Sequence, residues 1–316
     1  MRASKPRALA ALLAVSIPLG AAGTAAAKPD KSSGLPRSAK ASFTYALPGD
    51  RVYPEGIAVT QNQKRFFVTS TTDGSIFRGS VRGESARVFL PGGEDGRTTA
   101  IGIEASRGRL YVAGGATGSI FIYDISSRKL VRRVDTGTGG FINDIAVTRR
   151  GDVYATDSAR PNIIHIPADA SKPVEEIPYP DFRAGAFNAN GIALVGRRAL
   201  VFVNSGNGRL YRLNPRNDAI RAIDVAGPAL TNGDGLESRG RVLYVVRNQQ
   251  ELVARVRLSR NLRSGRVVSQ TTDATFRYPT TAASARGRLL VVNSQFNRRS
   301  AQDPELPFTV SSIRRP

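Results

Sequence analysis

Short strands in which apolar and polar positions alternate recur along the chain from about residue 54 to the C-terminus. Alternation with a period of two is typical of β-strands that bury one face. Six of these strands open alike, usually with Gly or Asp as the second residue of the segment. The six segments are residues 55–59, 101–105, 143–147, 190–194, 234–238 and 280–284. The chain is therefore expected to be an all-β repeat protein.

The spacing of these segments defines the repeat. Their second residues are 42 to 47 positions apart, and each segment is followed by a turn and a second strand rich in β-branched and aromatic residues. These second strands are predicted at 66–70, 110–114, 153–157, 200–204, 243–247 and 289–293. Third strands are predicted at 75–81, 119–125, 162–167, 209–213, 252–258 and 308–313, and most repeats add a fourth, such as 130–135.

Six repeats of this length predict a six-bladed β-propeller with four antiparallel strands in each blade. The last repeat lacks a fourth strand, and the alternating segment 41–47 precedes the first repeat. We expect this N-terminal strand to become the outer strand of the last blade and so to close the ring. A β-sandwich with long insertions is the competing fold, but it offers no reason for a six-fold period.

The N-terminus has the features of an export signal. Arg2, Lys5 and Arg7 precede an uncharged stretch, 8–27, which ends in small residues before Lys28. This pattern predicts a cleaved signal peptide at 1–27 and a secreted protein, followed by a flexible leader at 28–40 and the propeller domain at 41–316. The alternative is an uncleaved membrane anchor, since the stretch is long enough to span a bilayer. After cleavage no membrane-spanning segment is expected.

Composition excludes several kinds of site. The chain has no cysteine and one histidine, His165. Disulfides, thiolate metal sites and sites built from several imidazoles are therefore excluded. His165 lies in the middle of a predicted strand, away from the start of any repeat, so we expect a structural or surface role for it.

The net charge of +21 comes mainly from arginines spread along the whole chain. No helix-turn-helix, zinc-finger or RNA-binding motif accompanies them, so no specific nucleic-acid partner is expected. Weak contact with an anionic cell envelope is the partner that this charge predicts.

The residue that opens each segment is expected to face the central channel, because the first strand of a propeller blade is the innermost. These residues are Glu55, Ile101, Asn143, Asn190, Asp234 and Thr280. Two carboxylates and two carboxamides would then meet at one mouth of the channel. Oxygen ligands without His or Cys suit a hard cation, and Ca²⁺ is the first choice, with Zn²⁺, Mg²⁺ and Mn²⁺ as alternatives. An empty polar channel is the competing interpretation.

Four short motifs at repeat spacing resemble the senescence-marker-protein/gluconolactonase family, the regucalcin-like six-bladed propellers. The motifs begin at Pro54, Asn143, Asn190 and Asp234. The resemblance implies a divalent cation held by Glu55, Asn190 and Asp234, a catalytic general base at Asp234 and a substrate contact at Asn143. Lactonases of the family have an arginine two residues before that asparagine, where this chain has Phe141. A less polar ester or lactone is therefore easier to accommodate than a sugar lactone.

Two functions follow from these residues. The first is a secreted, metal-dependent hydrolase of a lactone or ester, in which the cation polarises the carbonyl and Asp234 takes a proton from water. The second is a non-catalytic propeller that binds a protein or cell-envelope ligand and keeps the ion as a structural element.

Overall fold

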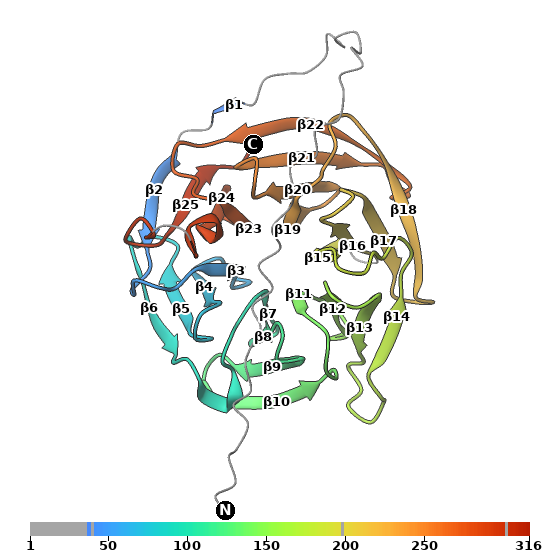
Figure 1. The fold of residues 1–316 in the computed structure, drawn as a ribbon, viewed down its shortest axis with the longest axis horizontal. Coiled ribbons are helices and arrows are strands. Elements are labelled where there is room, and N and C mark those ends of the chain that lie inside the picture. Colours follow the sequence, from blue (N-terminus) through green and yellow to red (C-terminus); the bar gives the residue numbers. More distant parts are fainter. Residues whose placement is uncertain (1–36, 39–40, 197–198, 301–302) are drawn as a thin grey trace, which may run out of the picture. The chain divides into compact units, whose positions relative to one another are not determined.

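The regular structure consists of β-strands and two short 3₁₀ turns, η1 (Glu94–Gly96) and η2 (Phe296–Arg298), in the part of the chain that the structure describes (Figure 1). The computed structural model describes residues 37–38, 41–196, 199–300 and 303–316. The predicted signal peptide and most of the predicted leader lie outside these residues. Within the described ranges no helix is long and apolar enough to cross a membrane.

Four sheets contain four strands each and follow the predicted repeat. The first is β3 (Pro54–Val59), β4 (Arg65–Ser70), β5 (Ile76–Ser80) and β6 (Ala86–Leu90). The second is β7 (Ile103–Ser106), β8 (Arg109–Ala113), β9 (Ser119–Asp124) and β10 (Leu130–Asp135). The third is β11 (Ile142–Val147), β12 (Val153–Asp157), β13 (Asn162–Ile166) and β14 (Glu175–Pro178). The fourth is β23 (Pro279–Ala285), β24 (Arg288–Asn293), β25 (Thr309–Arg314) and β2 (Ala41–Ala46).

The fifth sheet is larger and differs from the prediction. It contains one antiparallel run, β15 (Ala189–Val195), β16 (Ala199–Asn204), β17 (Leu210–Asn214) and β18 (Ala219–Ala226). A second run is β19 (Gly233–Arg239), β20 (Val242–Arg247), β21 (Leu252–Leu258) and β22 (Ser264–Thr272). The outer strands of the two runs, β18 and β22, pair in parallel from Asp224 to Ala226. The all-β, propeller-like fold is therefore confirmed, whereas these two runs form one sheet and not two separate blades.

The length of β22 gives a physical reason for this fusion. It is the longest strand and lies on the outside, where unpaired backbone groups favour pairing with another strand. Residues 264–266 of β22 pair with β18, and residues 271–272 pair with β1 (Arg37–Ser38). Two residues of the predicted leader are thus part of the sheet.

The first strand of every repeat faces the centre of the ring in Figure 1. The inner strands β3, β7, β11, β15, β19 and β23 contact one another in cyclic order, and β23 also contacts β3. The recurring glycine explains how closely they pack. A Cβ atom at Gly56 would lie 2.4 Å from the main-chain oxygen of Ile101 in the next repeat. At Gly235 it would lie 1.9 Å from Oγ1 of Thr281.

The N-terminal strand closes the ring as predicted. Strand β2 pairs antiparallel with β25, with Tyr45 opposite Val310. The Tyr45 ring is fully buried, and its hydroxyl donates a hydrogen bond of 2.8 Å to the main-chain oxygen of Val81, directly after β5 of the first sheet. One apolar cluster joins these first and last sheets and includes Phe66 and Phe308. The two ends of the repeat array therefore share a core.

Candidate functional site

Residues from four inner strands line one pocket at an end of the central channel. Glu55, Asn143, Asn190 and Asp234 all contribute to its wall, and its volume is about 490 Å³. Ile101 lines it as well. The structure therefore brings together every residue that the repeat register placed at this mouth except Thr280, whose hydroxyl donates instead to the main-chain oxygen of Glu55.

A repeated irregularity in strand pairing directs these side chains. In β3 the pairing with β4 shifts between Pro54 and Ile57, so Glu55 and Gly56 together face one residue of the partner strand. The same shift occurs in β11, β15, β19 and β23, at the matching residues. A β-bulge of this kind re-aims a side chain, and here it recurs at the site position.

Hydrogen bonds orient both asparagine side chains. Asn143 Nδ2 donates a hydrogen bond of 3.0 Å to Ser158 Oγ. Asn190 Nδ2 donates one of 3.0 Å to Ser205 Oγ. Each serine hydroxyl itself donates to a main-chain oxygen, that of Ala189 or that of Gly233. Because each hydroxyl has used its one hydrogen, it must accept from the amide. In both asparagines the amide nitrogen therefore faces the serine, and Oδ1 has no hydrogen-bond partner among the described residues.

Three buried oxygen atoms in this pocket have no hydrogen-bond partner in the described part of the chain. They are Glu55 Oε2, Asn143 Oδ1 and Asn190 Oδ1. Asp234 adds a carboxylate, which accepts a hydrogen bond of 2.9 Å from Asn248 Nδ2. Buried acceptors without donors are costly unless something satisfies them. A hard cation is a partner that satisfies acceptors of this type, so these four residues fit a cation site.

The pKa shifts of Glu55 and Asp234 agree with a cation site. Burial raises the pKa of Glu55 well above its usual range, and the negative charges of Asp234 and Asp144 raise it further. Burial also raises the pKa of Asp234 to about 7, although the hydrogen bond from Asn248 opposes the shift. Two buried carboxylates whose charges act on one another cannot both ionise cheaply without a positive charge beside them.

Apolar side chains form part of the pocket wall. Phe141 and Phe187 meet edge to face with ring centroids 5.6 Å apart, and Ile101, Tyr278 and Phe296 also contribute. Phe187 is 52% exposed, so an aromatic face is presented at the rim. Of these residues Ile101 and Phe141 were singled out from the sequence. Phe187, Tyr278 and Phe296 were missed because they stand outside the repeat register.

A second, smaller cavity of about 160 Å³ lies further along the inner strands and is also acidic. Glu104, Asp144 and Glu237 line it. Burial raises the pKa of Glu104 to about 8 and those of Asp144 and Glu237 to about 7. The sequence contained a signal for two of these acids, since Glu104 and Glu237 are each the fourth residue of a repeat opening.

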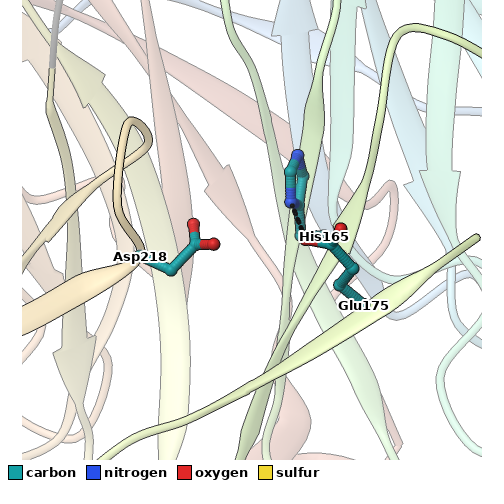
Figure 2. Close-up of side chains that lie close together, drawn as sticks. All are labelled: His165, Glu175 and Asp218. Atoms are coloured by element: carbon teal, nitrogen blue, oxygen red, sulfur yellow. Dashed lines mark hydrogen bonds and ion pairs between the residues drawn. The ribbon is translucent and has the colours of Figure 1, made fainter. Parts of the chain in front are cut away.

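His165 belongs to another cluster, on outer strands of the third sheet. Its Nδ1 lies 3.0 Å from Oε2 of Glu175 (Figure 2). Its ring stacks on that of Tyr154, with the ring centroids 4.4 Å apart. Asp218, from the turn between β17 and β18, approaches the same point, and one ligand atom of each lies within 4.8 Å of the others (Figure 2). The trio is a second group able to hold a metal ion. It contributes nothing to the channel pocket, in line with the prediction for His165.

No family model matches the chain, and no curated protein sequence is significantly similar to it. Solved structures do match. A calcium-binding protein, regucalcin, from Agrobacterium tumefaciens is 13% identical, with a TM-score of 0.65 over 89% of this chain and 97% of that one. The fold is that of the β-propellers.

Two further matches show how varied proteins of this fold are. The Malassezia sympodialis allergen Mala s 1 is 16% identical, with a TM-score of 0.67 over 85% of this chain and 95% of that one. Virginiamycin B lyase from Staphylococcus aureus is also 16% identical, with a TM-score of 0.60 over 79% of this chain and 80% of that one. At these identities the likeness extends to the fold, and function has to be argued from the site.

Proposed function

We propose that this protein is a secreted, divalent-cation-dependent hydrolase of an apolar ester or lactone. The observation that carries the proposal is the set of three buried, unpartnered oxygen atoms, on Glu55, Asn143 and Asn190, beside the Asp234 carboxylate. Two of these oxygens are fixed toward the pocket by serines that leave no other orientation for the amides. Such an arrangement is expected where a cation completes the site.

Ca²⁺ is the proposed ion, held by Glu55, Asn190 and Asp234 with Asn143 beside it. The donors are carboxylate and amide oxygens, which suit a hard cation better than a thiophilic one. A propeller neighbour, regucalcin, is described as calcium-binding, which supports the same choice. When bound, the cation supplies Lewis-acid activation of a carbonyl and of water.

Asp234 is the proposed general base. Its carboxylate is buried in the pocket and held at Oδ2 by Asn248, so its other oxygen is available to accept a proton. In the proposed reaction Asp234 takes a proton from the water that attacks the ester carbonyl. The carbonyl carbon then loses its bond to the alkoxy oxygen, which takes the proton back from Asp234 as it leaves.

The pocket wall supports an apolar substrate. Phe141 and Phe187 form an aromatic pair in the wall of the same pocket as the four polar residues, and Ile101 adds an apolar side chain to that wall. This face can bind an acyl chain or aromatic ring and exclude water from the reacting bond. Phe141 provides no hydrogen bond for a sugar hydroxyl.

The scaffold of this site is proposed to be a six-bladed propeller in which two blades have fused at their outer edge. The antiparallel runs β15–β18 and β19–β22 would be two blades, joined by the short parallel pairing of β18 with β22. The cyclic contacts among six inner strands support this count. Export through the 1–27 signal and weak attraction to an anionic cell envelope complete the proposal.

The test is a panel of 4-nitrophenyl esters and aliphatic lactones assayed with purified protein before and after chelation. Hydrolysis that is lost with chelator and restored by Ca²⁺ is expected, and Asp234→Asn should abolish it. Glu104→Gln, which changes a channel carboxylate outside the pocket, is the matched control and should remain active. Ion binding without hydrolysis of any member of the panel would favour the non-catalytic propeller with a structural ion.

A further inference from the structure

Arg299 lines the same pocket as the four polar residues, from the segment that follows η2. Its guanidinium carbon lies 5.0 Å from the ring centroid of Tyr53 and 5.3 Å from that of Phe296. Its Nη2 donates to the hydroxyls of Thr71 and Thr72. These contacts hold the guanidinium at a fixed place in the wall.

The guanidinium has no anionic partner among the residues that the structure describes. Nearby Glu305 forms its ion pairs with Arg277 and Arg298. Arg299 Nε and Nη1 make no hydrogen bond within the described part of the chain and are not sealed from solvent. Burial lowers the pKa of Arg299, and the positive charge of Arg51 lowers it further.

Arg299 therefore brings a partly buried positive charge into the wall of the pocket. A partly buried positive charge is normally paired, because desolvation of an unpaired charge is costly. Stacking on two aromatic rings recovers only part of that cost. Two donor groups remain, Nε and Nη1, and each can donate a charge-assisted hydrogen bond to an anionic group.

We infer that Arg299 is a specificity residue that binds a carboxylate of the substrate, so that the substrate class is an ester or lactone that carries a carboxylate at its far end. This inference rests on the proposed function for the identity of the reacting bond. The pocket would then recognise three parts of one molecule. The four polar residues bind the reacting carbonyl, the Phe141–Phe187 pair binds the apolar body, and Arg299 binds the carboxylate.

The kinetic test uses 4-nitrophenyl hydrogen adipate and its neutral methyl ester, which differ only in the distal charge. The wild-type protein is expected to show a kcat/KM at least tenfold higher for the acid. Arg299→Gln should reduce this ratio to about one, chiefly through the KM for the acid, while the rate with the methyl ester is retained. Arg299→Lys keeps the charge but loses the guanidinium donors Nε and Nη1, so it should give an intermediate ratio. Arg51→Gln, the same charge change at an exposed neighbour, should leave the ratio unchanged.

A binding measurement separates this inference from the proposed function. Calorimetric titration with 6-phenylhexanoate and with its methyl ester requires no catalysis. Tighter binding of the acid that is lost in Arg299→Gln supports the carboxylate subsite even if no ester is ever hydrolysed. Hydrolysis without any preference for the acid, in a wild-type protein that binds acid and methyl ester equally, overturns the subsite and leaves the proposed function intact. The preference for the acid over its methyl ester is measured on the wild-type protein. A folding defect in Arg299→Gln therefore does not prevent the test.

Discussion

The hydroxyl of Thr280 donates a hydrogen bond of 2.9 Å to the main-chain oxygen of Glu55, 225 residues earlier in the chain. These are the opening residues of the last and first repeats. The bond therefore crosses the seam where the ring closes, and it fixes the backbone of a residue proposed to hold the cation. Ring closure and site geometry are coupled at this point.

Thr280→Val tests this coupling. The change removes the hydroxyl and leaves a buried carbonyl with one partner fewer, so we expect a loss of about 1–2 kcal/mol in the free energy of unfolding. Calcium affinity should fall as well, because Glu55 loses a restraint. Thr280→Ser keeps the hydroxyl and should retain both properties. Calorimetry measures the calcium affinity, and urea unfolding measures the stability. Unchanged calcium affinity in the valine variant would show that the ring closure and the cation site are independent.

Tyr45 is expected to report on closure by the N-terminal strand. Tyr45→Ala removes a fully buried ring between the first and last sheets and should cost about 3–5 kcal/mol. Tyr45→Phe removes only the hydrogen bond to Val81 and should cost about 1 kcal/mol. Urea unfolding gives both values. Equal and small losses would mean that β2 contributes little to the ring.

Gly235→Ala tests the close approach of inner strands. The added Cβ would lie 1.9 Å from Thr281 Oγ1, so the strands must separate. A loss of roughly 1–3 kcal/mol is expected. Gly83→Ala is the control, because its Cβ would lie 3.4 Å from the nearest atom. Similar melting temperatures for the two variants would argue against the packing explanation of the repeated glycine.

Stability is expected to fall as pH rises, because the pKa values of the buried channel acids are raised, and Glu104 is one of them. Burial raises its pKa from 4.5 to about 8, so the folded state holds this proton more tightly than the unfolded state does. The resulting stabilisation is complete below about pH 4.5 and is lost as pH rises through about 8. Glu104→Gln should therefore reduce the slope of melting temperature against pH between 5 and 9 and raise stability at pH 8, while Asp144 and Glu237 keep part of the slope.

Asp124→Asn is the control for this experiment. Its hydrogen bonds to Ser126 and Ser127 lower the pKa of Asp124 to about 2, so it titrates well outside the range tested. The slope between pH 5 and 9 should not change in this variant. If Glu104→Gln has the wild-type slope, then another group controls the dependence.

Phe141 should control the preference for apolar substrates. Phe141→Ala removes half of the aromatic pair in the pocket wall, so the KM for 4-nitrophenyl octanoate is expected to rise about tenfold or more. The acetate ester is too short to use this face fully and should be affected much less. Equal effects on the two esters would place the acyl chain elsewhere.

Much of the architecture could be predicted from the sequence, because the strands follow a regular repeat. The residue that opens each inner strand has a fixed register, so the repeat alone assigns Glu55, Asn143, Asn190 and Asp234 to one pocket. The bulge that aims them could not be foreseen, since it depends on the partner strand. Phe187 and Arg299 come from irregular segments whose positions follow from tertiary contacts, and no periodicity marks them. The pairing of β18 with β22 could not be predicted either, because no sequence pattern marks which outer strands will pair.

Calorimetric titration of purified, metal-free protein with Ca²⁺ tests the central claim most directly. The account predicts one ion per chain at the channel pocket, with affinity reduced at least tenfold in Glu55→Gln and in Asp234→Asn and retained in Glu104→Gln. Asp218→Asn removes a ligand of the separate His165 trio and should leave this binding event in place. Calcium binding that survives unchanged in both Glu55→Gln and Asp234→Asn, or no binding at millimolar Ca²⁺, would contradict the account.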